Sequence, residues 1–370
     1  MKSNTLSSIS RRDFLKIVGA TSVVAVGGSL LHTYTPWLDY DEQVNQNRQE
    51  MNRNYPNQMI EMVRYATLAA NGHNTQPWKF KIDNDSIEIH PDYTRSLPIV
   101  DPNHRELWIS LGCALENLLI TAMGMGYSPQ VSYPENGDII KVSLSEDTAQ
   151  ISPLLEAIPE RQNTRGEYDG QPINNSDLDQ LKSLAVEPGV ALHVVSGLDR
   201  IERVVEYVNQ GNLIQYANTD FVDELIFWLR FNRREILKSR DGLYSACSGN
   251  PEVPGWLGKM FVSGTKPQQQ ADADAKKLRS SSGVIHITSD LDDKSSWVRT
   301  GQVYERLSLM MTTMNIKSAL LNQPIEVADL RSEFQSAMGL GSSLPQLMVR
   351  FGYAPAMPKS MRRPVEQLLI

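Results

Sequence analysis

One sequence pattern occurs twice in this chain and constrains its fold more than any other feature. Residues 108–118 align with residues 297–307, and Trp, Gly, Glu and Leu recur at identical offsets, 189 residues apart. A strand-like run precedes each copy, at residues 86–92 and 283–290. The same strand–loop–helix order in both copies predicts two related halves within one chain. The alternative is a chance similarity between two apolar helices.

The length of the chain limits how many domains it can form, and its net charge limits which partners it can bind. The chain has 370 residues, enough for one large or two ordinary domains with a sizeable core. Its net charge of −7 argues against nucleic acid as a partner. We place a signal segment at 1–36, a first half at 37–150 and a second half at 151–370. Within the second half, residues 240–275 are rich in Gly and Pro, which predicts a lid-like excursion or a disordered loop.

The first residues of the chain carry the pattern of an export signal. The paired arginines Arg11 and Arg12 precede Phe-Leu-Lys, and an apolar run of 15 residues follows at 17–31. A bilayer-spanning helix needs about 20 residues, so the run is short for that role. The arginine pair resembles the bacterial twin-arginine signal. The alternative is a basic patch before a short membrane anchor. Because no clean Ala-x-Ala cleavage site follows, an uncleaved anchor also stays open.

This signal predicts where the protein works. We expect it in the periplasm or on the outer face of the cytoplasmic membrane, with the twin-arginine export machinery as a partner. That pathway exports folded proteins, often with a cofactor already bound. The signal therefore favours a protein that carries a redox cofactor.

Metal and disulfide chemistry find little support in the sequence. The six histidines show no close metal-ligand spacing, so we predict no metal. Two cysteines, Cys113 and Cys247, are too few for a disulfide framework, although one bridge between them is an alternative.

A short stretch at residues 69–80 joins a helical run to a strand-like run. Gly72 allows close approach of the backbone, and the amides of Asn74 and Gln76 each offer a donor and an acceptor. Pro77 ends the helical pattern. These features suit a flat heteroaromatic ligand with polar edges. The alternative is an ordinary corner between a helix and a strand.

Two basic clusters indicate anion binding. Arg161 and Arg165 flank Asn163 before a helical pattern, and Arg362 and Arg363 form a second pair near the C-terminus. Guanidinium groups bind phosphate oxygens as two-pronged donors. The alternative is a solvated charged loop. The chain has no Gly-x-Ser-x-Gly elbow, Walker loop or Gly-x-Gly-x-x-Gly after a strand.

Together these motifs resemble the nitroreductase superfamily of FMN proteins. The resemblance is closest to its fused-repeat, twin-arginine-exported Acg-type branch, and it runs from about residue 57 to 370. Each motif is weak alone, but their order and spacing together are specific. The segments that carry it are 74–78 (Asn-Thr-Gln-Pro-Trp), 101–107 (Asp-Pro-x-x-Arg-Glu-Leu), 161–165 (Arg-x-x-Thr-Arg), 322–326 (Asn-Gln-Pro-Ile-Glu), 350–353 (Arg-Phe-Gly-Tyr) and 362–364 (Arg-Arg-Pro).

The resemblance implies an α+β, nitroreductase-like fold in which two fused repeats form a pseudo-dimer, so that we expect a monomer. It also implies one composite FMN site between the halves. The phosphate or ribityl chain is assigned to Arg161, Asn163, Arg165, Arg362 and Arg363. The flavin ring is assigned to Asn71, Gly72 and Asn74 of the first half, and the surroundings of flavin N5 to the turn with Asn322 and Gln323.

The second pseudo-symmetric site looks degraded. Near residues 45–60 only Arg48 and Arg53 are basic, without an Arg-x-x-x-Arg segment. Residues 186–189, Val-Glu-Pro-Gly, stand where the second half should carry Asn-x-Gln-Pro-Trp. We therefore expect one FMN per chain.

The family also implies that the flavin performs the chemistry. Hydride passes to and from N5 by a ping-pong route, usually from a nicotinamide donor, and no catalytic side chain is required. The first hypothesis is an FMN-dependent oxidoreductase of the bacterial cell envelope, with an unknown donor and acceptor. The second is a flavin-binding or sequestering protein without turnover, and the third is a remnant without cofactor. A lid at 240–275 would favour the second.

Overall fold

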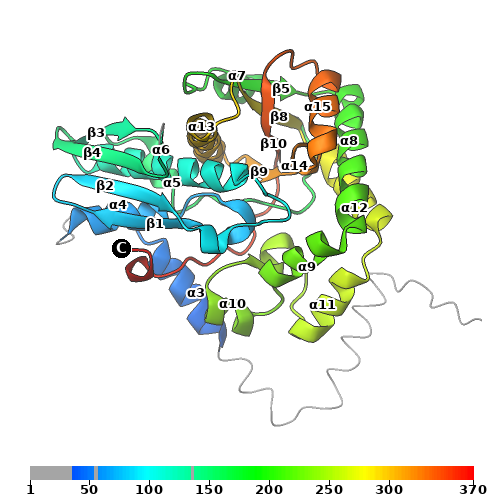
Figure 1. Cartoon of the computed structure of the whole chain (residues 1–370), viewed down its shortest axis with the longest axis horizontal. Coiled ribbons are helices and arrows are strands. Elements are labelled where there is room, and N and C mark those ends of the chain that lie inside the picture. The colour runs from blue at the N-terminus through cyan, green and yellow to red at the C-terminus, as the bar shows by residue number, and fades with distance from the viewer. Residues whose placement is uncertain (1–35, 54–56, 135–136) are drawn as a thin grey trace, which may run out of the picture.

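The chain folds around two antiparallel sheets of four strands each (Figure 1). The structure is a computed structural model and describes residues 36–53, 57–134 and 137–370. The predicted signal at 1–36 lies outside the described residues, apart from Pro36. The first sheet has the order β1-β2-β4-β3 and consists of β1 (Trp78–Ile82), β2 (Ser86–Pro91), β3 (Tyr127–Ser132) and β4 (Ile140–Glu146).

The second sheet repeats this arrangement. Its order is β5-β8-β10-β9, and it consists of β5 (Val190–Val195), β8 (Gly283–Ser289), β9 (Lys317–Leu320) and β10 (Leu344–Gly352). The spatial order of the strands is the same in both sheets: the first strand of each half lies beside the second, the second beside the fourth, and the fourth beside the third. A long helix follows the second strand in each half. The predicted α+β fold agrees with this architecture, which is consistent with two fused repeats.

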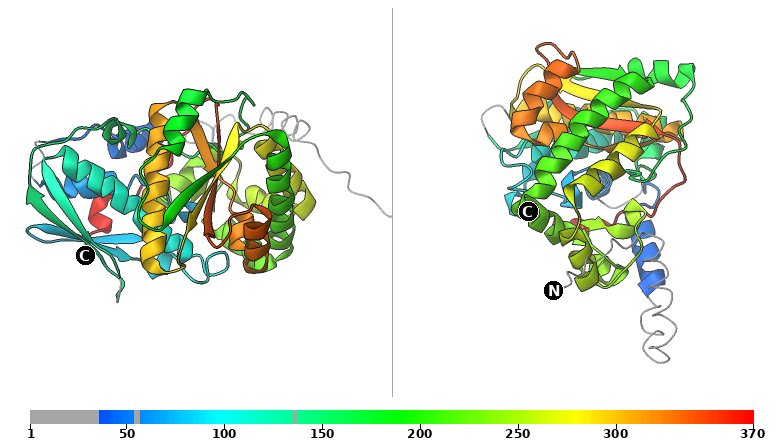
Figure 2. Two further views of the ribbon diagram at one scale, coloured as in Figure 1. Left: turned by 90° about the horizontal axis from the view of Figure 1, so that it is seen from above. Right: turned by 90° about the vertical axis from the view of Figure 1, so that its right-hand side faces the viewer.

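The two long helices, α5 (Arg105–Gly124) and α13 (Lys294–Thr313), lie between the sheets and join them in one core (Figure 2, left). They meet at the glycines of the repeated pattern. A Cβ at Gly112 would lie 2.0 Å from the carbonyl oxygen of Val298, and one at Gly301 would lie 2.0 Å from that of Ile109. The repeated Gly is therefore required because the two backbones touch there.

Helix α5 is long and apolar enough to cross a membrane by length and composition. In this protein 89% of its most apolar window is buried inside the fold, so it is a core helix. Helix α13 begins after Asp293, whose carboxylate accepts a hydrogen bond from the backbone N–H of Ser296. This side chain caps the free N–H groups at the start of the helix.

The halves differ in what separates their first two strands. A three-residue turn at 83–85 joins β1 to β2, whereas residues 196–282 lie between β5 and β8. The excursion is thus longer than the predicted 240–275, and most of it is helical. Its elements are α8 (Leu198–Ala217), α9 (Thr219–Trp228), β6 (Leu229–Arg230), α10 (Arg233–Ser239), β7 (Leu243–Tyr244), a 3-10 turn (Ser245–Ser248), α11 (Gly255–Ser263) and α12 (Pro267–Arg279).

Helices α8 and α12 cover one face of the second sheet through a cluster that includes Val204, Leu278 and Met348. Helices α9, α10 and α11 lie at the lower end of the molecule in Figure 1, beside α3 (Pro36–Asn47). The other helices are α4 (Gln58–Ala66), α6 (Pro153–Ala157), α7 (Asn175–Lys182), α14 (Gln323–Glu326) and α15 (Ala328–Ala337), with 3-10 turns at Gly72–Asn74, Tyr93–Arg95 and Val365–Gln367.

The C-terminus of the second half returns to the first half. The N–H of Phe80 donates to the carbonyl of Leu368 at 2.7 Å, and the N–H of Ile370 donates to the carbonyl of Phe80 at 3.0 Å. These bonds add the tail to the exposed edge of β1, which ties the halves together and protects an edge strand.

The glycine contact yields the first prediction. Gly301→Ala should force α5 and α13 apart, because a methyl group meets backbone that cannot rotate away. Overpacking of a core costs about 1–3 kcal/mol, and rigid backbone places this site at the upper end. Urea unfolding measures the change in free energy. Gly137→Ala is the control because no atom lies within 4 Å of its Cβ position. Equal stability of both variants would contradict the close contact.

A buried histidine yields the second prediction. His286 of β8 is fully buried, and neither ring nitrogen has a hydrogen-bond partner among the described residues. Burial lowers its pKa to about 3, with a smaller contribution from His193. The folded protein therefore holds it neutral, while the unfolded chain binds a proton below its ordinary pKa of about 6.5.

The free energy of unfolding should consequently fall as the pH drops from 6.5 towards 3. This one group contributes a slope of about 1.4 kcal/mol per pH unit. His286→Leu removes the group and should make the pH dependence shallower by that slope, with little loss of stability at pH 7.5. Unfolding titrations of both proteins between pH 4 and 8 measure the difference. If the free energy of unfolding depends on pH in the same way in both proteins, His286 binds protons equally in the folded and unfolded states.

Candidate anion and cofactor site

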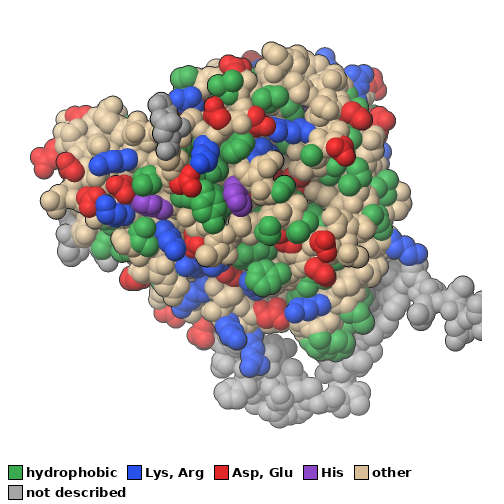
Figure 3. Space-filling model, viewed as in Figure 1, with side chains coloured by type: hydrophobic (Ala, Val, Ile, Leu, Met, Phe, Trp, Pro, Cys, Tyr) green, Lys and Arg blue, Asp and Glu red, His purple; other side chains and the backbone are tan. Residues whose placement is uncertain are grey.

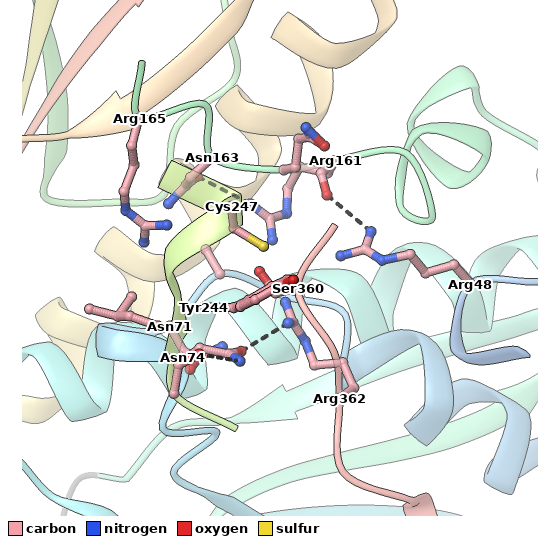
Figure 4. A pocket seen from close by; sticks show the side chains of 14 residues that line it. Arg48, Asn71, Asn74, Arg161, Asn163, Arg165, Tyr244, Cys247, Ser360 and Arg362 are labelled. Carbon is pink, nitrogen blue, oxygen red and sulfur yellow. Dashed lines mark hydrogen bonds between the residues drawn. The ribbon is translucent and has the colours of Figure 1, made fainter. Parts of the chain in front are cut away.

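A cavity of about 430 Å³, its open mouth included, lies between the two halves (Figure 4). Segments far apart in the sequence form its wall, so that it exists only in the assembled fold. Its lining residues are Arg48, Ala70, Asn71, Asn74, Arg161, Gln162, Asn163, Arg165, Gly242, Leu243, Tyr244, Cys247, Ser360 and Arg362.

Four arginines converge on this cavity, and the described lining contains no Asp or Glu. Arg48 comes from the chain after α3, and its guanidinium donates to the carbonyls of Pro159 at 2.7 Å and Arg161 at 3.1 Å. Burial lowers its pKa to about 10, and the charge of Arg161 adds to this effect. Arg48 thus fixes the segment that carries the predicted anion-binding residues.

Arg161 is held by the repeated glutamate of α13. Its Nε lies 2.9 Å from Oε1 of Glu305, and both side chains are buried. The other carboxylate oxygen of Glu305 accepts the N–H of Ala70 at 3.1 Å. One buried carboxylate therefore connects α13, the Arg161 segment and the loop at 69–80.

Arg362 uses all five of its N–H donors within the protein. Its Nε donates to the carbonyl of Thr67 at 2.6 Å, and Nη2 donates to the carbonyls of Leu68 and Ala69 at 3.1 Å each. Nη1 donates to Oδ1 of Asn74 at 2.9 Å and to its neighbour's carbonyl. These acceptors include the free carbonyls that follow α4, so Arg362 is a structural cap.

Arg165 differs from the other three arginines. It is half-buried and lines the cavity, yet its guanidinium has no hydrogen bond or ion pair to any described residue. Burial lowers its pKa. Figure 4 shows its side chain reaching down past Asn163 towards Asn71. An unpaired cation in such a place favours an anionic ligand.

Asn163 lies next to Arg165, and only the oxygen of its side-chain amide is hydrogen-bonded to described residues. Its Oδ1 accepts from Arg161 at 3.4 Å and from the hydroxyl of Tyr304 at 3.2 Å. Its Nδ2 has no acceptor among the residues that the structure describes. Asn163 therefore has an amide N–H group free of any described acceptor beside the cation of Arg165, and its role in binding an anion stays a prediction.

The loop at 69–80 has an unusual backbone. His73, Asn74 and Gln76 all have positive φ, at 48°, 54° and 54°. Non-glycine residues adopt this conformation rarely, and surrounding contacts must hold them there. The backbone N–H of Gln76 donates to Oδ1 of Asn71 at 2.9 Å, which fixes the turn. A Cβ at Gly72 would lie 3.3 Å from Leu97, so this glycine packs against the protein.

The amides expected to recognise a ligand are engaged inside the protein. Asn74 accepts from Arg362 and donates to the carbonyl of Gly242 at 3.1 Å. Gln76 donates to the carbonyl of Arg240 at 2.9 Å and accepts the backbone N–H of Arg363 at 2.8 Å. Both side chains therefore position the loop.

Residues 240–248 of the excursion form one wall of the cavity. The N–H of Gly242 donates to the carbonyl of Asn74 at 3.1 Å, reciprocating the bond from the Asn74 amide. Asp241 forms ion pairs with Arg95 and, at 2.7 Å, with Arg230. The first part of the predicted excursion 240–275 is thus hydrogen-bonded to the loop at 69–80.

Four of the predicted site residues do not line this cavity: Gly72, Asn322, Gln323 and Arg363. Asn322 donates to Glu106 at 3.2 Å and accepts the N–H of Met348, while Gln323 donates to Asp274 at 3.1 Å. Arg363 is half-buried and lies outside the cavity lining.

The turn at Asn322 borders a pair of buried acids, Glu106 and Glu326. Burial raises the pKa of both carboxyl groups, and for Glu326 the neighbouring charge of Glu106 raises it further. Gln215 of α8 donates to Glu326 at 2.6 Å. The excursion therefore also holds this turn in place.

Sequence reasoning missed several lining residues. Arg48 was assigned to a degraded second site, but the structure places it in this cavity. Tyr244 and Cys247 come from the excursion, whose path no local pattern reveals. Glu305 binds Arg161 from outside the lining, and the sequence indicated it as the repeated Glu of the duplicated helix. Both cysteines are free and buried.

The pseudo-symmetric position is occupied by side chains. Glu116, the counterpart of Glu305, is bound by Arg306 through distances of 2.6 and 2.9 Å. Arg306 also binds Glu187 at 2.8 Å and the carbonyl of Ala185 at 2.8 Å. Arg306 thus pairs with Glu116 as Arg161 pairs with Glu305. Among the described residues, no group of three His, Cys, Asp or Glu side chains is arranged to hold a metal.

Comparison with known proteins finds nitroreductase-type relatives. "Putative NAD(P)H nitroreductase Rv3131" of Mycobacterium tuberculosis (strain ATCC 25618 / H37Rv) is 26% identical over 343 residues, covering 86% of this chain and 93% of the relative. "Putative NAD(P)H nitroreductase acg" of the same strain is 22% identical over 321 residues, covering 83% and 93%. These relatives confirm the predicted resemblance to the nitroreductase superfamily and its Acg-type members.

Among solved structures, a nitroreductase with bound FMN from Bacteroides fragilis NCTC 9343 is similar with a TM-score of 0.36 and 15% identity, covering 60% of this chain and 99% of that chain. No protein-family model matches the sequence.

The different engagement of the arginines yields the third prediction. Arg362→Ala leaves the carbonyl of Thr67 and Oδ1 of Asn74 without a donor and should lower the free energy of unfolding by about 3–5 kcal/mol. Arg165→Ala breaks no described bond and should change it by less than about 1 kcal/mol. Urea unfolding of the cofactor-free proteins measures both. A large loss in Arg165→Ala would show that this residue has a structural role.

Proposed function

We propose that this chain, which is similar to NAD(P)H nitroreductases, is an FMN-binding oxidoreductase of the bacterial cell envelope with one flavin site per chain. The observation that carries the proposal is the unpaired guanidinium of Arg165 in a cavity lined by four arginines. The names of the relatives and the bound FMN of a structural neighbour support the choice of cofactor.

The residues present fit a phosphate group. Four arginines face the cavity, and among the described residues only Arg161 of the four forms an ion pair, with Glu305. A phosphate monoester carries about two negative charges near neutral pH and accepts several hydrogen bonds. Arg165 would donate to it as a two-pronged cation, and Asn163 would add one N–H. Arg48, Arg161 and Arg362 would act through their charge while holding the walls in place.

Bound FMN would supply hydride transfer through its N5, and the protein would bind, orient and shield it. We propose a ping-pong route with a nicotinamide or another envelope donor. The loop at 69–80 would border the ring from the first half. Residues 240–248 would exclude water, because the bond between Gly242 and Asn74 and the ion pair between Asp241 and Arg95 close one wall.

The same closure favours a second candidate, a protein that binds or sequesters flavin without turnover. A substrate reaches the ring only where the wall formed by 240–248 leaves it exposed. Anaerobic stopped-flow with NADH and NADPH separates the two candidates. Rapid reduction of bound flavin supports the oxidoreductase, whereas tight binding with slow reduction supports sequestration.

The fourth prediction concerns cofactor binding. Arg165→Ala should weaken FMN binding about 10- to 100-fold, because it removes a charge-assisted bond worth about 1.5–3 kcal/mol. Fluorescence titration of the cofactor-free protein measures the affinity and the expected ratio of one FMN per chain. Arg165→Lys keeps the charge without the two-pronged geometry. Its affinity for FMN should therefore lie between those of the unsubstituted protein and of Arg165→Ala. Arg363→Ala, outside the cavity, is the matched control. Unchanged affinity in Arg165→Ala, or two FMN per chain, would refute the site.

A further inference from the structure

Helix α11 has a composition that its surroundings do not explain. Its sequence, Gly-Trp-Leu-Gly-Lys-Met-Phe-Val-Ser, contains no acid and one base, Lys259. Trp256 is 70% exposed and Met260 is 56% exposed, and these residues lie one helical turn apart on one face. Gly258 is the one buried residue of the helix, and a Cβ there would lie 2.1 Å from the ring of Phe231. The helix thus touches the protein along a narrow contact and turns apolar side chains to the outside.

Helix α9 extends this surface. It packs against α11, and its Phe227 is 69% exposed. Figure 3 shows hydrophobic side chains over α11 at the lower end of the molecule, with Lys and Arg side chains over α10 beside them. Arg234 and Lys238 are exposed on α10. A contiguous apolar surface with a basic border is typical of an interaction site.

The position at which the described chain begins indicates what this surface faces. Pro36 begins α3 at the same lower end (Figures 1 and 2), and Tyr40 and Val44 of α3 pack against Ile236 of α10. The apolar run of the sequence ends at Leu31, five positions before Pro36. Five residues span at most about 18 Å. A chain whose apolar run lies in a bilayer therefore keeps the start of α3 within about 18 Å of that bilayer, at the same lower end of the molecule as α10 and α11 (Figure 1).

We propose that Phe227, Trp256 and Met260 form a contact surface for the headgroup region of a lipid bilayer. Aromatic side chains favour this region, because their rings are apolar and their edges tolerate water. Arg234, Lys238 and Lys259 would attract anionic lipids. The inference rests on the proposed location at the envelope membrane and is independent of the flavin chemistry. A second copy of this chain is the competing occupant of the surface.

The test uses the full chain in vesicles of phosphatidylethanolamine and phosphatidylglycerol. A nitroxide label is attached at Met260→Cys, and its collisions with oxygen, which partitions into lipid, are compared with those of a water-soluble nickel chelate. The label at position 260 should collide more often with oxygen than with the chelate. Ser332→Cys on α15, at the opposite end of Figure 1, is the matched control and should favour the chelate. The unsubstituted chain reports labelling of the buried Cys113 and Cys247.

Each outcome decides the proposal. Adding Trp256→Glu should shift the label at position 260 towards water while the chain still floats with the vesicles. A label at 260 that favours the chelate in floating protein overturns the surface but not the location. Spin–spin broadening between labels shows that a second copy occupies the surface and also overturns it. A chain that does not float overturns both location and surface. The flavin absorbance of the same samples tests the proposed function separately.

Discussion

The contact between Gly112 and Gly301 sets the geometry on which the rest of the protein depends. Two helices can bring their backbones together only where neither carries a side chain, and the duplicated pattern provides such a position on both helices. Glu305 follows Gly301 by one helical turn on α13. The crossing therefore carries its carboxylate to Ala70 of the first half and to Arg161 at the start of the second. A packing constraint in the core thus determines where the segment with Arg161, Asn163 and Arg165 lies.

Charge burial explains why the arginines of the cavity have different roles. Removing a guanidinium from water is costly unless protein groups replace its hydration. Arg362 and Arg161 meet this requirement through carbonyls and Glu305, so their burial stabilises the fold. Arg165 lacks such partners among the described residues, and its charge is left for a ligand. At the pseudo-symmetric position Arg306 satisfies Glu116 and Glu187, which leaves no comparable unpaired cation there.

The sequence predicted what depends on local pattern. The repeated helix and its upstream strand predicted two related halves, which are consistent with two sheets of the same strand order, and Arg161, Asn163 and Arg165, which were predicted as one cluster, line one cavity. It could not show that Asn74 is bonded to Arg362 and Gly242, because those partners lie far away along the chain. Asn322 and Gln323 were assigned through the resemblance, whereas contacts with Glu106 and Asp274 decide their position. The path of residues 240–248 could not be predicted either, because it depends on contacts with residues far away along the chain.

The excursion links the cavity to the lower end of the molecule. Residues 240–248 form a wall of the cavity and also connect α10 to α11, so the position of that wall depends on how these helices are held. Helix α10 packs against α3 through Ile236, Tyr40 and Val44, and Tyr244 belongs to the same cluster. The hydroxyl of Tyr40 lies 3.9 Å from the sulfur of Cys247, which lines the cavity. The packing of α3 against α10 therefore extends to the candidate flavin site through Tyr244 and through the contact between Tyr40 and Cys247.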